Sequence, residues 1–488
     1  MSAIPSHWAK VAISEVAQII SGGTPPSKDE RCFSPPGQGI PWLTPADLSG
    51  YKKQVISHGS RDLSSFGISS CSAKVMPTGA VLFSSRAPIG YVVIASNPIS
   101  TNQGFKSFVF AIDFDSRFSY YQLKHIKPVA EAMATGTTFK ELSGSAAAKL
   151  PFLVAPLNEQ KRIADKLDTV LTRVDAVNAR LARVAPLLKR FRQSVLAAAM
   201  SGRLTEDWRG AHPTVPLTKE LLLESRLGHN PTSRDTKITH GLVESGLHVG
   251  AGQDLPENWL RSCIGMIGVV SNGSTPSRAR PDFWIGPIHW VSSGEVRNRK
   301  IRSTNESITQ LGFESSSVRL LPAGTVLIAM IGEGKTRGQS ALLEIEATIN
   351  QNIAAIVPVP ELIESQYLWY WFQSQYETNR LAGNGSGPQA LNCQKVRELP
   401  INLPPMEEQS EIIRRVETLF AFADRLEARL QAARTAANRL TPALLAKAFR
   451  GELVPQDPND EPAAELLKRL AASAPATTKR RGRPAKAA

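Results

Sequence analysis

Apolar residues recur between Ile163 and Val195 at alternating steps of four and three residues. This spacing is the heptad pattern of a coiled coil, in which one apolar stripe stays against a partner helix. The pattern returns 249 residues later, from Ile412 to Leu444, and every position is again apolar. The sequence therefore predicts two long helices. Their apolar stripe, called the seam below, consists of Ile163, Leu167, Val170, Val174, Val177, Leu181, Val184, Leu188, Phe191 and Val195 with Ile412, Val416, Leu419, Ala423, Leu426, Leu430, Ala433, Ala437, Leu440 and Leu444.

The repeat also covers the regions that precede the two helices. Residues 4–8 return as residues 255–259, each ending in Pro-x-x-Trp. Self-similarity at one long period indicates an internal duplication, here globular unit, long helix, globular unit, long helix. Gly202 and Gly451 stand where each helix should stop, because glycine adopts the left-handed conformation of a helix end most easily.

The duplication predicts a pseudo-twofold axis, which would make the two helices antiparallel. If the seams meet symmetrically, Leu167 faces Leu440 and Phe191 faces Val416. In this register the three alanines of the second seam oppose valines, so that no layer of the seam is overfilled. Pro186 lies inside the first helix and predicts a bend or a local break there.

The globular regions are rich in Gly, Pro and Ser and combine two kinds of local pattern. A short apolar run at residues 80–84 predicts a strand, whereas residues 119–134 and 364–381 predict helices. Each globular unit should therefore have a mixed α/β fold. Residues 205–254 have the composition of a linker, with one helix expected near residues 217–226.

The chain has 488 residues, a formal charge of +14 and a pI of about 9.7. A basic excess suits a polyanionic partner such as nucleic acid, although many basic proteins bind none. Five basic residues and no acidic residue lie among the last ten. Within them, Arg481-Gly482-Arg483-Pro484 resembles an AT-hook, and a generic basic tail explains the motif equally well.

The four cysteines, Cys32, Cys71, Cys263 and Cys393, form no C-x-x-C pair and lie near no cluster of histidines. This pattern argues against a disulfide framework or a zinc site and predicts a reducing compartment, the cytoplasm. No apolar run approaches the roughly 18 residues of a membrane span, and the N-terminus has no secretory signal pattern. A membrane is therefore not an expected partner.

Gly334-Lys335-Thr336 ends in the manner of a phosphate-binding loop after a strand-like run. Such a loop must open a helix, whereas the residues that follow predict a turn and a strand. A nucleotide-hydrolysing DNA enzyme is the second hypothesis, which loss of an ATPase activity on replacement of Lys335 would support. The Pro-Pro strings at residues 34–37 and 403–406 lack the aromatic residue of an adenine methyltransferase motif. With no catalytic constellation, a structural coiled-coil protein without DNA contact is the third hypothesis.

A shared motif opens both long helices, with Leu-Pro, a second proline and Glu-Gln in the same order. The two copies are Leu150-Pro151, Pro156 and Glu159-Gln160, and Leu399-Pro400, Pro405 and Glu408-Gln409. Together with the heptads, the glycine stops and the repeated Asn-Gln pairs, Asn102-Gln103 and Asn350-Gln351, this motif resembles the specificity (S) subunit of type I restriction–modification systems.

The resemblance implies an α+β fold, with two mixed α/β target-recognition domains separated by two long antiparallel coiled-coil helices in a pseudo-twofold duplication. The expected segments are target-recognition domain 1 (1–155), conserved long helix 1 (156–202), a linker (203–254), target-recognition domain 2 (255–404), conserved long helix 2 (405–451) and a flexible basic tail (452–488).

Such a subunit is not an enzyme. It reads a bipartite, asymmetric site in double-stranded DNA and docks two modification (adenine methyltransferase) subunits and the restriction (translocase and endonuclease) subunits. The resemblance therefore places S-adenosylmethionine, ATP and Mg on the partner subunits, and no cofactor or metal on this chain.

The duplication also separates scaffold from DNA readout. Residues common to both copies, including the two Asn-Gln pairs, should build the scaffold, whereas polar and basic residues that differ could contact DNA. The DNA-binding candidates are Lys28, Arg31, Ser84, Arg86, Thr137, Lys140, Arg278, Arg280, Lys335, Arg337 and Gln389.

Overall fold

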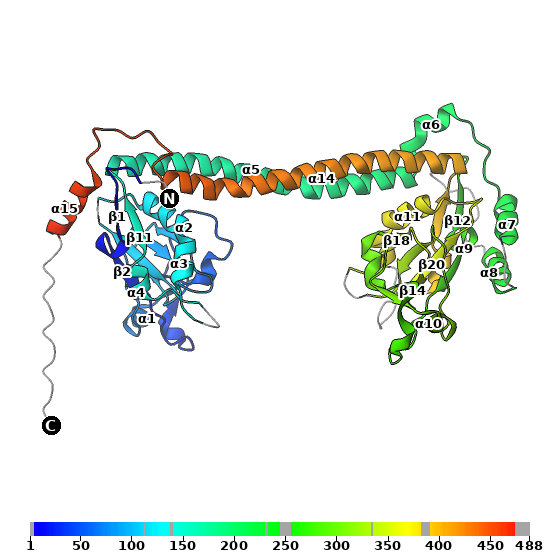
Figure 1. Cartoon of the computed structure of the whole chain (residues 1–488), viewed down its shortest axis with the longest axis horizontal. Coiled ribbons are helices and arrows are strands. Elements are labelled where there is room, and N and C mark those ends of the chain that lie inside the picture. Colours follow the sequence, from blue (N-terminus) through cyan, green and yellow to red (C-terminus); the bar gives the residue numbers. More distant parts are fainter. Residues whose placement is uncertain are drawn as a thin grey trace, which may run out of the picture. The chain divides into compact units, whose positions relative to one another are not determined.

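The computed structural model describes residues 4–111, 113–136, 140–229, 233–244, 255–332, 335–381 and 391–473. The chain divides into two compact units. Unit 1 comprises Met1–Ala182 with Ala432–Ala488, and unit 2 comprises Arg183–Gln431. Each unit thus combines one globular domain with a part of both long helices (Figure 1). No helix in the described ranges is long and apolar enough to cross a membrane.

The two predicted long helices are α5 (Leu157–Met200) and α14 (Met406–Ala448). Helix α5 continues through Pro186 as one helix, so the predicted local break does not occur. Gly202 and Gly451 follow the two helices with left-handed φ angles of 76° and 75°, as the sequence predicted.

The two helices are antiparallel within each unit. In unit 1, Leu167 near the start of α5 shares an apolar cluster with Leu445 near the end of α14. In unit 2, Val195 near the end of α5 shares a cluster with Val416 near the start of α14. The predicted direction of packing is therefore confirmed in each unit.

Most predicted seam residues are shielded from solvent. Buried positions are Ile163, Leu167, Val174, Leu188, Val195, Ile412, Val416, Ala423, Leu430 and Ala437; partly buried ones are Val170, Leu181, Val184, Phe191, Leu419, Leu426 and Leu444. Ala433, Val177 and Leu440 are exposed.

The predicted contact between Leu167 and Leu440 is wrong. Leu440 is 45% exposed, and Leu167 instead clusters with Leu445, which is 5% exposed. An α-helix has 3.6 residues per turn, so a straight helix drifts from a strict heptad seam by about 20° per heptad. This drift carries Ala433 and Leu440 out of the interface, leaves Ala437 in it and brings in Leu445, which lies outside the predicted seam.

Two leucines of α14 provide a test of this packing. We expect Leu430→Ala to lower the free energy of unfolding by about 2–3 kcal/mol, because Leu430 is 7% exposed and its removal leaves a cavity. The matched control Leu440→Ala should change it by less than about 0.5 kcal/mol. Urea denaturation measures both values, and equal losses would contradict the placement of the seam.

Each globular domain is built on a five-stranded sheet. In unit 1 the order is β2 (Ala17–Ser21), β10 (Lys106–Phe110), β7 (Val81–Phe83), β8 (Val92–Ala95) and β5 (Val55–Ile56). In unit 2 it is β13 (Gly268–Asn272), β20 (Ile353–Pro358), β17 (Val326–Ala329), β18 (Ser340–Leu343) and β15 (Lys300–Ile301). The central strands are apolar on both faces because α2 (Ser116–His125) and α11 (Ser365–Ser374) each cover one face, and a second apolar cluster packs on the other face of each sheet.

Smaller sheets complete each domain. The first strand pairs with the last in both domains, β1 (Ala9–Ala12) with β11 (Pro151–Val154) and β12 (Leu260–Cys263) with β21 (Pro400–Leu403). A second sheet has the order β3 (Phe33–Ser34), β6 (Arg61–Leu63), β4 (Ile40–Leu43) and β9 (Ser100–Thr101) in unit 1, and β16 (Glu306–Ile308), β14 (Trp284–Val291) and β19 (Thr348–Ile349) in unit 2. Repetition of the topology in the described ranges confirms the predicted duplication and α+β fold.

Short helices connect the strands. In unit 1 these are η1 (Ile13–Glu15), η2 (Glu30–Cys32), η3 (Pro45–Leu48), α1 (Ser65–Ser69), α3 (Lys127–Met133) and α4 (Gly144–Ala148). In unit 2 they are η4 (Arg203–Thr205), α9 (Ile264–Ile267), η5 (Pro281–Phe283), η6 (Ser293–Asn298), α10 (Gln310–Glu314), α12 (Tyr376–Leu381) and α13 (Cys393–Glu398).

The region expected to be a linker contains more structure than predicted. It forms α6 (Glu206–Ala211), α7 (Lys219–Gly228) and α8 (Ser233–Glu244), of which only α7 matches the predicted helix. Leu222 and Leu242 are buried in the main apolar cluster of unit 2. Contacts with the domain therefore stabilise helices that are too short to show a clear apolar period.

The tail also departs from the prediction of a flexible segment that starts at residue 452. Residues 452–473 belong to unit 1 and end in α15 (Ala463–Ser473), whose Leu466 is buried. Asp460 pairs with Arg162 of α5 at 2.6 Å. The motif that resembles an AT-hook lies outside the described residues.

The Glu-Gln motif ties each domain to its helix through a buried network. Glu159 accepts a hydrogen bond from the indole of Trp8 at 2.9 Å, and Gln160 accepts one from the backbone of Asp115 at 3.1 Å. Gln160 also donates to the backbone carbonyl of Ala155 at 2.8 Å. Both motif side chains are fully buried, so this network fixes the start of α5 to the globular domain of unit 1.

Candidate nucleic-acid interface

Several loops gather at one end of the five-stranded sheet in unit 1. Strands β2, β10 and β7 are antiparallel neighbours, so the loops after β2 and β7 lie beside the loop before β10. Ser85 donates a backbone hydrogen bond to Gly104 at 2.7 Å, and Leu142 donates one to Ser85 at 2.9 Å. We call this surface the loop edge, formed in unit 1 by the described residues of 22–32, 84–90, 102–104 and 135–142.

Unit 2 has an equivalent loop edge. It consists of the described residues of 273–283, 330–339 and 350–352, with residue 391. Met330 donates a backbone hydrogen bond to Asn352 at 2.9 Å, and Leu391 donates one to Met330 at 3.1 Å. These bonds correspond to those of unit 1, so the duplication preserves the backbone of the loop edge.

The residues common to both copies hold the loop edge together. The Trp42 indole donates to the carbonyl of Gly23 at 3.1 Å, and the Trp290 indole donates to Ser274 at 3.1 Å. Asn102 accepts a hydrogen bond from the backbone of Gly104 at 2.9 Å. These contacts stabilise the backbone of the loops.

The Asn-Gln pairs add further contacts of the same kind. Thr24 donates a hydrogen bond to Gln103, and Thr275 donates one to Gln351. A Cβ atom at Gly22 would lie 2.0 Å from the carbonyl oxygen of Asn102, so this close approach requires glycine. The structural role expected for the Asn-Gln pairs is supported by these bonds.

The loop edge of unit 1 presents most of its predicted cations to solvent. Lys28 and Lys140 are exposed and have no acidic partner within the ranges that the structure describes. Arg31 pairs with Asp29 at 2.8 Å, and its guanidinium lies 5.1 Å from the Phe66 ring.

Two other candidates of unit 1 have different environments. The guanidinium of Arg86 lies 3.8 Å from the carboxylate of Glu141 and is partly exposed. Ser84 is fully buried, and its hydroxyl donates to the carbonyl of Pro88 at 2.7 Å and accepts from Tyr91 at 2.8 Å. Ser84 therefore holds its own loop, and its prediction as a DNA contact is wrong. Thr137 lies outside the described residues.

The loop edge of unit 2 presents a different set of charges. Arg278 pairs with Glu306, and its guanidinium stacks on Trp284 at 3.8 Å. Arg280 pairs with Asp282 at 2.6 Å. Lys335 is exposed and Arg337 is partly buried, and Gln389 lies outside the described residues.

The ion pairs lower the pKa values of the carboxylates at both loop edges. The side-chain hydrogen bond from Arg31 lowers the pKa of Asp29, and that from Arg280 lowers the pKa of Asp282. In the same way, the hydrogen bond from Arg278 lowers the pKa of Glu306. The loop after β2 in unit 1 carries its ion pair in the order Asp29-x-Arg31, whereas the loop after β13 in unit 2 carries the reverse order, Arg280-x-Asp282.

Arg61, which was not among the predicted DNA-binding candidates, lies beside the loop edge of unit 1, opposite the tryptophan that bonds to Gly23. Its guanidinium lies 3.9 Å from the Phe33 ring and 5.5 Å from the Trp42 ring. Arg61 lies opposite Trp42 on β6, whereas Glu306 takes the equivalent place in unit 2 and binds Arg278. Both domains thus place a guanidinium on the repeated tryptophan, but from different elements. An alignment of β6 with β16 could have revealed that Arg61 in unit 1 is replaced by Glu306 in unit 2.

Residues 5–185 and 256–433 match the model of the type I restriction modification DNA specificity domain. These two matches cover more than half of the 488 residues. The chain belongs to the type I DNA specificity family.

Curated members of this family support the assignment over most of the chain. The EcoBI specificity subunit of Escherichia coli is 30% identical over 371 residues, which cover 74% of this chain and 72% of the relative. The MjaIX specificity subunit of Methanocaldococcus jannaschii is 36% identical over 369 residues, which cover 75% of this chain and 76% of the relative.

Two solved structures share the fold. A chain of a type I R-M system aligns with a TM-score of 0.62 at 16% identity, over 92% of this chain and 99% of that chain. The HsdS subunit of Thermoanaerobacter tengcongensis aligns with a TM-score of 0.56 at 17% identity, over 92% of this chain and 98% of that chain.

The specificity-family fold gives the loop with Lys335 a different context from a phosphate-binding loop. Residues 335–338 form turns, and β18 follows at Ser340 and pairs antiparallel with β17. A phosphate-binding loop joins a strand to a helix whose N-terminus faces the phosphates, and a hairpin between two strands cannot do so. The described residues contain no group of three His, Cys, Asp or Glu side chains that could hold a metal ion.

Proposed function

We propose that this chain is the DNA-recognition subunit of a type I restriction–modification complex, in which each domain reads one half of a bipartite, asymmetric site. The observation that carries the proposal is the repeated loop edge, whose backbone contacts are the same in both domains while its exposed side chains differ. Equal scaffolds with different polar surfaces suit two domains that read two different half-sites.

The chemistry of the loop edge suits double-stranded DNA. Exposed cations such as Lys28, Lys140 and Lys335 can contact phosphates, and the chain carries a formal charge of +14. The arginines stacked on aromatic rings are held in place and can offer two parallel donors to the major-groove edge of guanine.

We propose a non-catalytic role for this chain within the complex. Two modification subunits would supply methyl transfer to adenine with S-adenosylmethionine, and restriction subunits would use ATP and Mg. We expect the proposed complex to act in the cytoplasm, because its DNA target and its partner subunits would be there. We further expect half-sites about one helical turn apart, roughly 34–36 Å, so that both domains meet one face of the duplex.

Replacing both arginines of the unit 2 loop edge tests the proposal. We expect Arg278→Ala with Arg280→Ala to slow methylation of the cognate site at least about 30-fold, because two base contacts of about 1–3 kcal/mol each are lost. The measurement is the methylated motif and its rate in DNA exposed to the full complex. The motif should become degenerate only in the half-site that unit 2 reads.

Arg450→Ala is the matched control, since Arg450 is an exposed arginine that pairs with Glu452 at 2.8 Å outside both loop edges. It should leave the motif and the rate unchanged. A motif that stays intact in both half-sites after the double replacement would contradict readout by this loop edge.

A further inference from the structure

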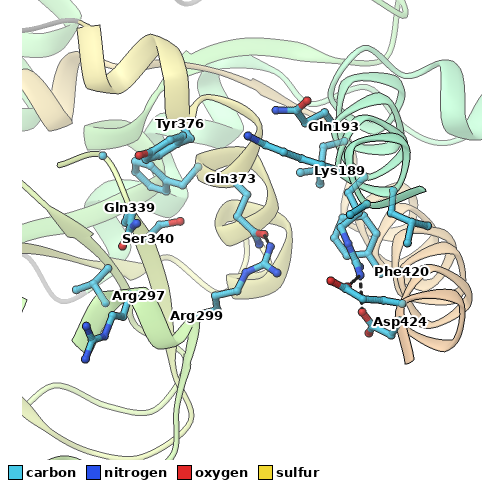
Figure 2. Close-up of a pocket in the computed structure, with 18 residues that line it drawn as sticks. Lys189, Gln193, Arg297, Arg299, Gln339, Ser340, Gln373, Tyr376, Phe420 and Asp424 are labelled. Atoms are coloured by element: carbon cyan, nitrogen blue, oxygen red, sulfur yellow. Dashed lines mark hydrogen bonds and ion pairs between the residues drawn. The ribbon is translucent and has the colours of Figure 1, made fainter. Parts of the chain in front are cut away.

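Unit 2 contains a cavity of about 550 Å³ between its part of the long helices and its globular domain (Figure 2). Its charged lining consists of Lys189, Arg192, Arg297, Arg299, Asp424 and Glu427. Arg192 pairs with both acids, at 2.7 Å to Asp424 and 3.0 Å to Glu427. The other three cations have no acidic ion-pair partner in the described part of the chain, so the cavity carries a positive excess.

Three polar atoms in the cavity wall are shielded from solvent and have no hydrogen-bond partner among the described residues. They are the amide oxygen of Gln339, the hydroxyl of Ser340 and the amide nitrogen of Gln373. The Gln373 amide has a fixed orientation because its oxygen accepts a hydrogen bond from Arg299 (Figure 2). Buried polar groups are rarely left unpaired, so a ligand with both donors and acceptors would favour small side-chain rotations that bring these atoms to the cavity surface.

Aromatic rings complete the wall of the cavity. Phe372, Tyr376 and Phe420 line it, and Arg192 lies over the Phe420 ring at 5.5 Å. The cavity therefore combines cations, amide groups and flat apolar surfaces, and its volume lies within the range of small-molecule sites.

The duplication provides an internal comparison. The equivalent cavity of unit 1 has a volume of about 220 Å³ and is lined by Lys52, Gln54, Tyr120, Tyr121, Lys124 and other residues. Gln54 of the domain donates to Asp168 of α5 at 3.3 Å, and Tyr121 donates to the same carboxylate. None of its described lining side chains has a buried unpaired polar atom. The open, unsatisfied cavity is thus a property of unit 2 and not of the fold.

We propose that the cavity of unit 2 binds a nucleotide. Its phosphates would lie against Lys189 and Arg299, because guanidinium and ammonium groups form charge-assisted hydrogen bonds with phosphate oxygens. The edge of the base would pair with the amides of Gln339 and Gln373, which offer an acceptor and a donor as a base does. The proposal does not depend on DNA recognition by the loop edges.

Calorimetric titration of the full chain with ADP in the absence of Mg tests the site. Adenosine and pyrophosphate, the two halves of ADP, are titrated separately. We expect one saturable site for ADP, with at least about tenfold tighter binding than either half, because both ends of the cavity contribute. If a four-nucleotide single strand displaces ADP, the site is supported, and the nucleotide that it binds belongs to a nucleic-acid strand.

The cavity arginine provides the decisive variant. Arg299→Gln should weaken ADP about 10- to 100-fold, because it removes a charged donor. Lys124→Gln removes the same charge at the position in unit 1 that corresponds to Gln373, and it should leave ADP binding unchanged. If Arg299→Gln alters the circular dichroism spectrum, Lys189→Gln takes its place.

Three results would overturn the proposal. The first is no saturable binding of ADP at millimolar concentration. The second is an equal loss of affinity in the unit 1 and unit 2 variants, which would place the nucleotide elsewhere. The third is pyrophosphate binding as tight as ADP binding, which would exclude any role for the base.

Discussion

Replacing Glu408 with alanine is expected to lower the free energy of unfolding of unit 2 by about 3–5 kcal/mol. Its carboxylate is fully buried and accepts hydrogen bonds from Trp259 at 2.9 Å, from Thr205 at 2.8 Å and from Arg209. The alanine variant leaves an arginine without its acid and an indole without an acceptor, inside a closed site. Removal of one member of a buried charged network is among the costliest single changes in a protein.

Glu407→Ala is the matched control, because Glu407 precedes Glu408 in the same first turn of α14 and is exposed. Urea denaturation followed by tryptophan fluorescence gives both values, with Trp259 as a reporter in the network. The control should change the stability by less than about 0.5 kcal/mol. If Glu408→Ala were as mild as Glu407→Ala, the network would not fix the helix to the domain.

Inserting one heptad into both long helices is expected to lengthen the unspecified spacer of the DNA site by about three base pairs. Seven helical residues add roughly 10.5 Å at 1.5 Å per residue, and base pairs are about 3.4 Å apart. The insertions belong after Ala182 and after Gln431, where the chain passes between the two units. A whole heptad keeps the seam in register, and the insertions leave every residue of both loop edges unchanged.

The methylated motif of DNA exposed to the complex reports the result. Both half-sites should stay the same while the spacer lengthens. An insertion into α5 alone should abolish methylation, because it breaks the match between the two seams. An unchanged spacer with both insertions would show that the helices do not set the distance between half-sites.

The antiparallel helices, their glycine ends and the duplication were predictable because they rest on periodicity and repetition. The exact partners in the seam were not, because the drift of a 3.6-residue turn exposes Leu440 and buries Leu445. Helices α6 and α8 were missed because tertiary contacts, rather than a long apolar period, stabilise them.

The candidate site was only partly predictable. Differences between the two copies pointed to the arginines after β2 and after β13, which the structure places at the two loop edges. They also pointed to Ser84, because sequence alone does not show that this hydroxyl turns inward to Pro88 and Tyr91. Arg61 was missed because its equivalent, Glu306, has the opposite charge.

The exchange between Arg61 and Arg278 has a consequence for how new specificities arise. In unit 1 the guanidinium comes from β6, and in unit 2 it comes from the loop after β13, yet both stack on the same repeated tryptophan. The backbone bonds of the loop edge are the same in the two cases. Substitutions at these exposed positions can therefore change the recognition chemistry at little cost in folding, so a new specificity needs changes in only a few side chains on an unchanged scaffold.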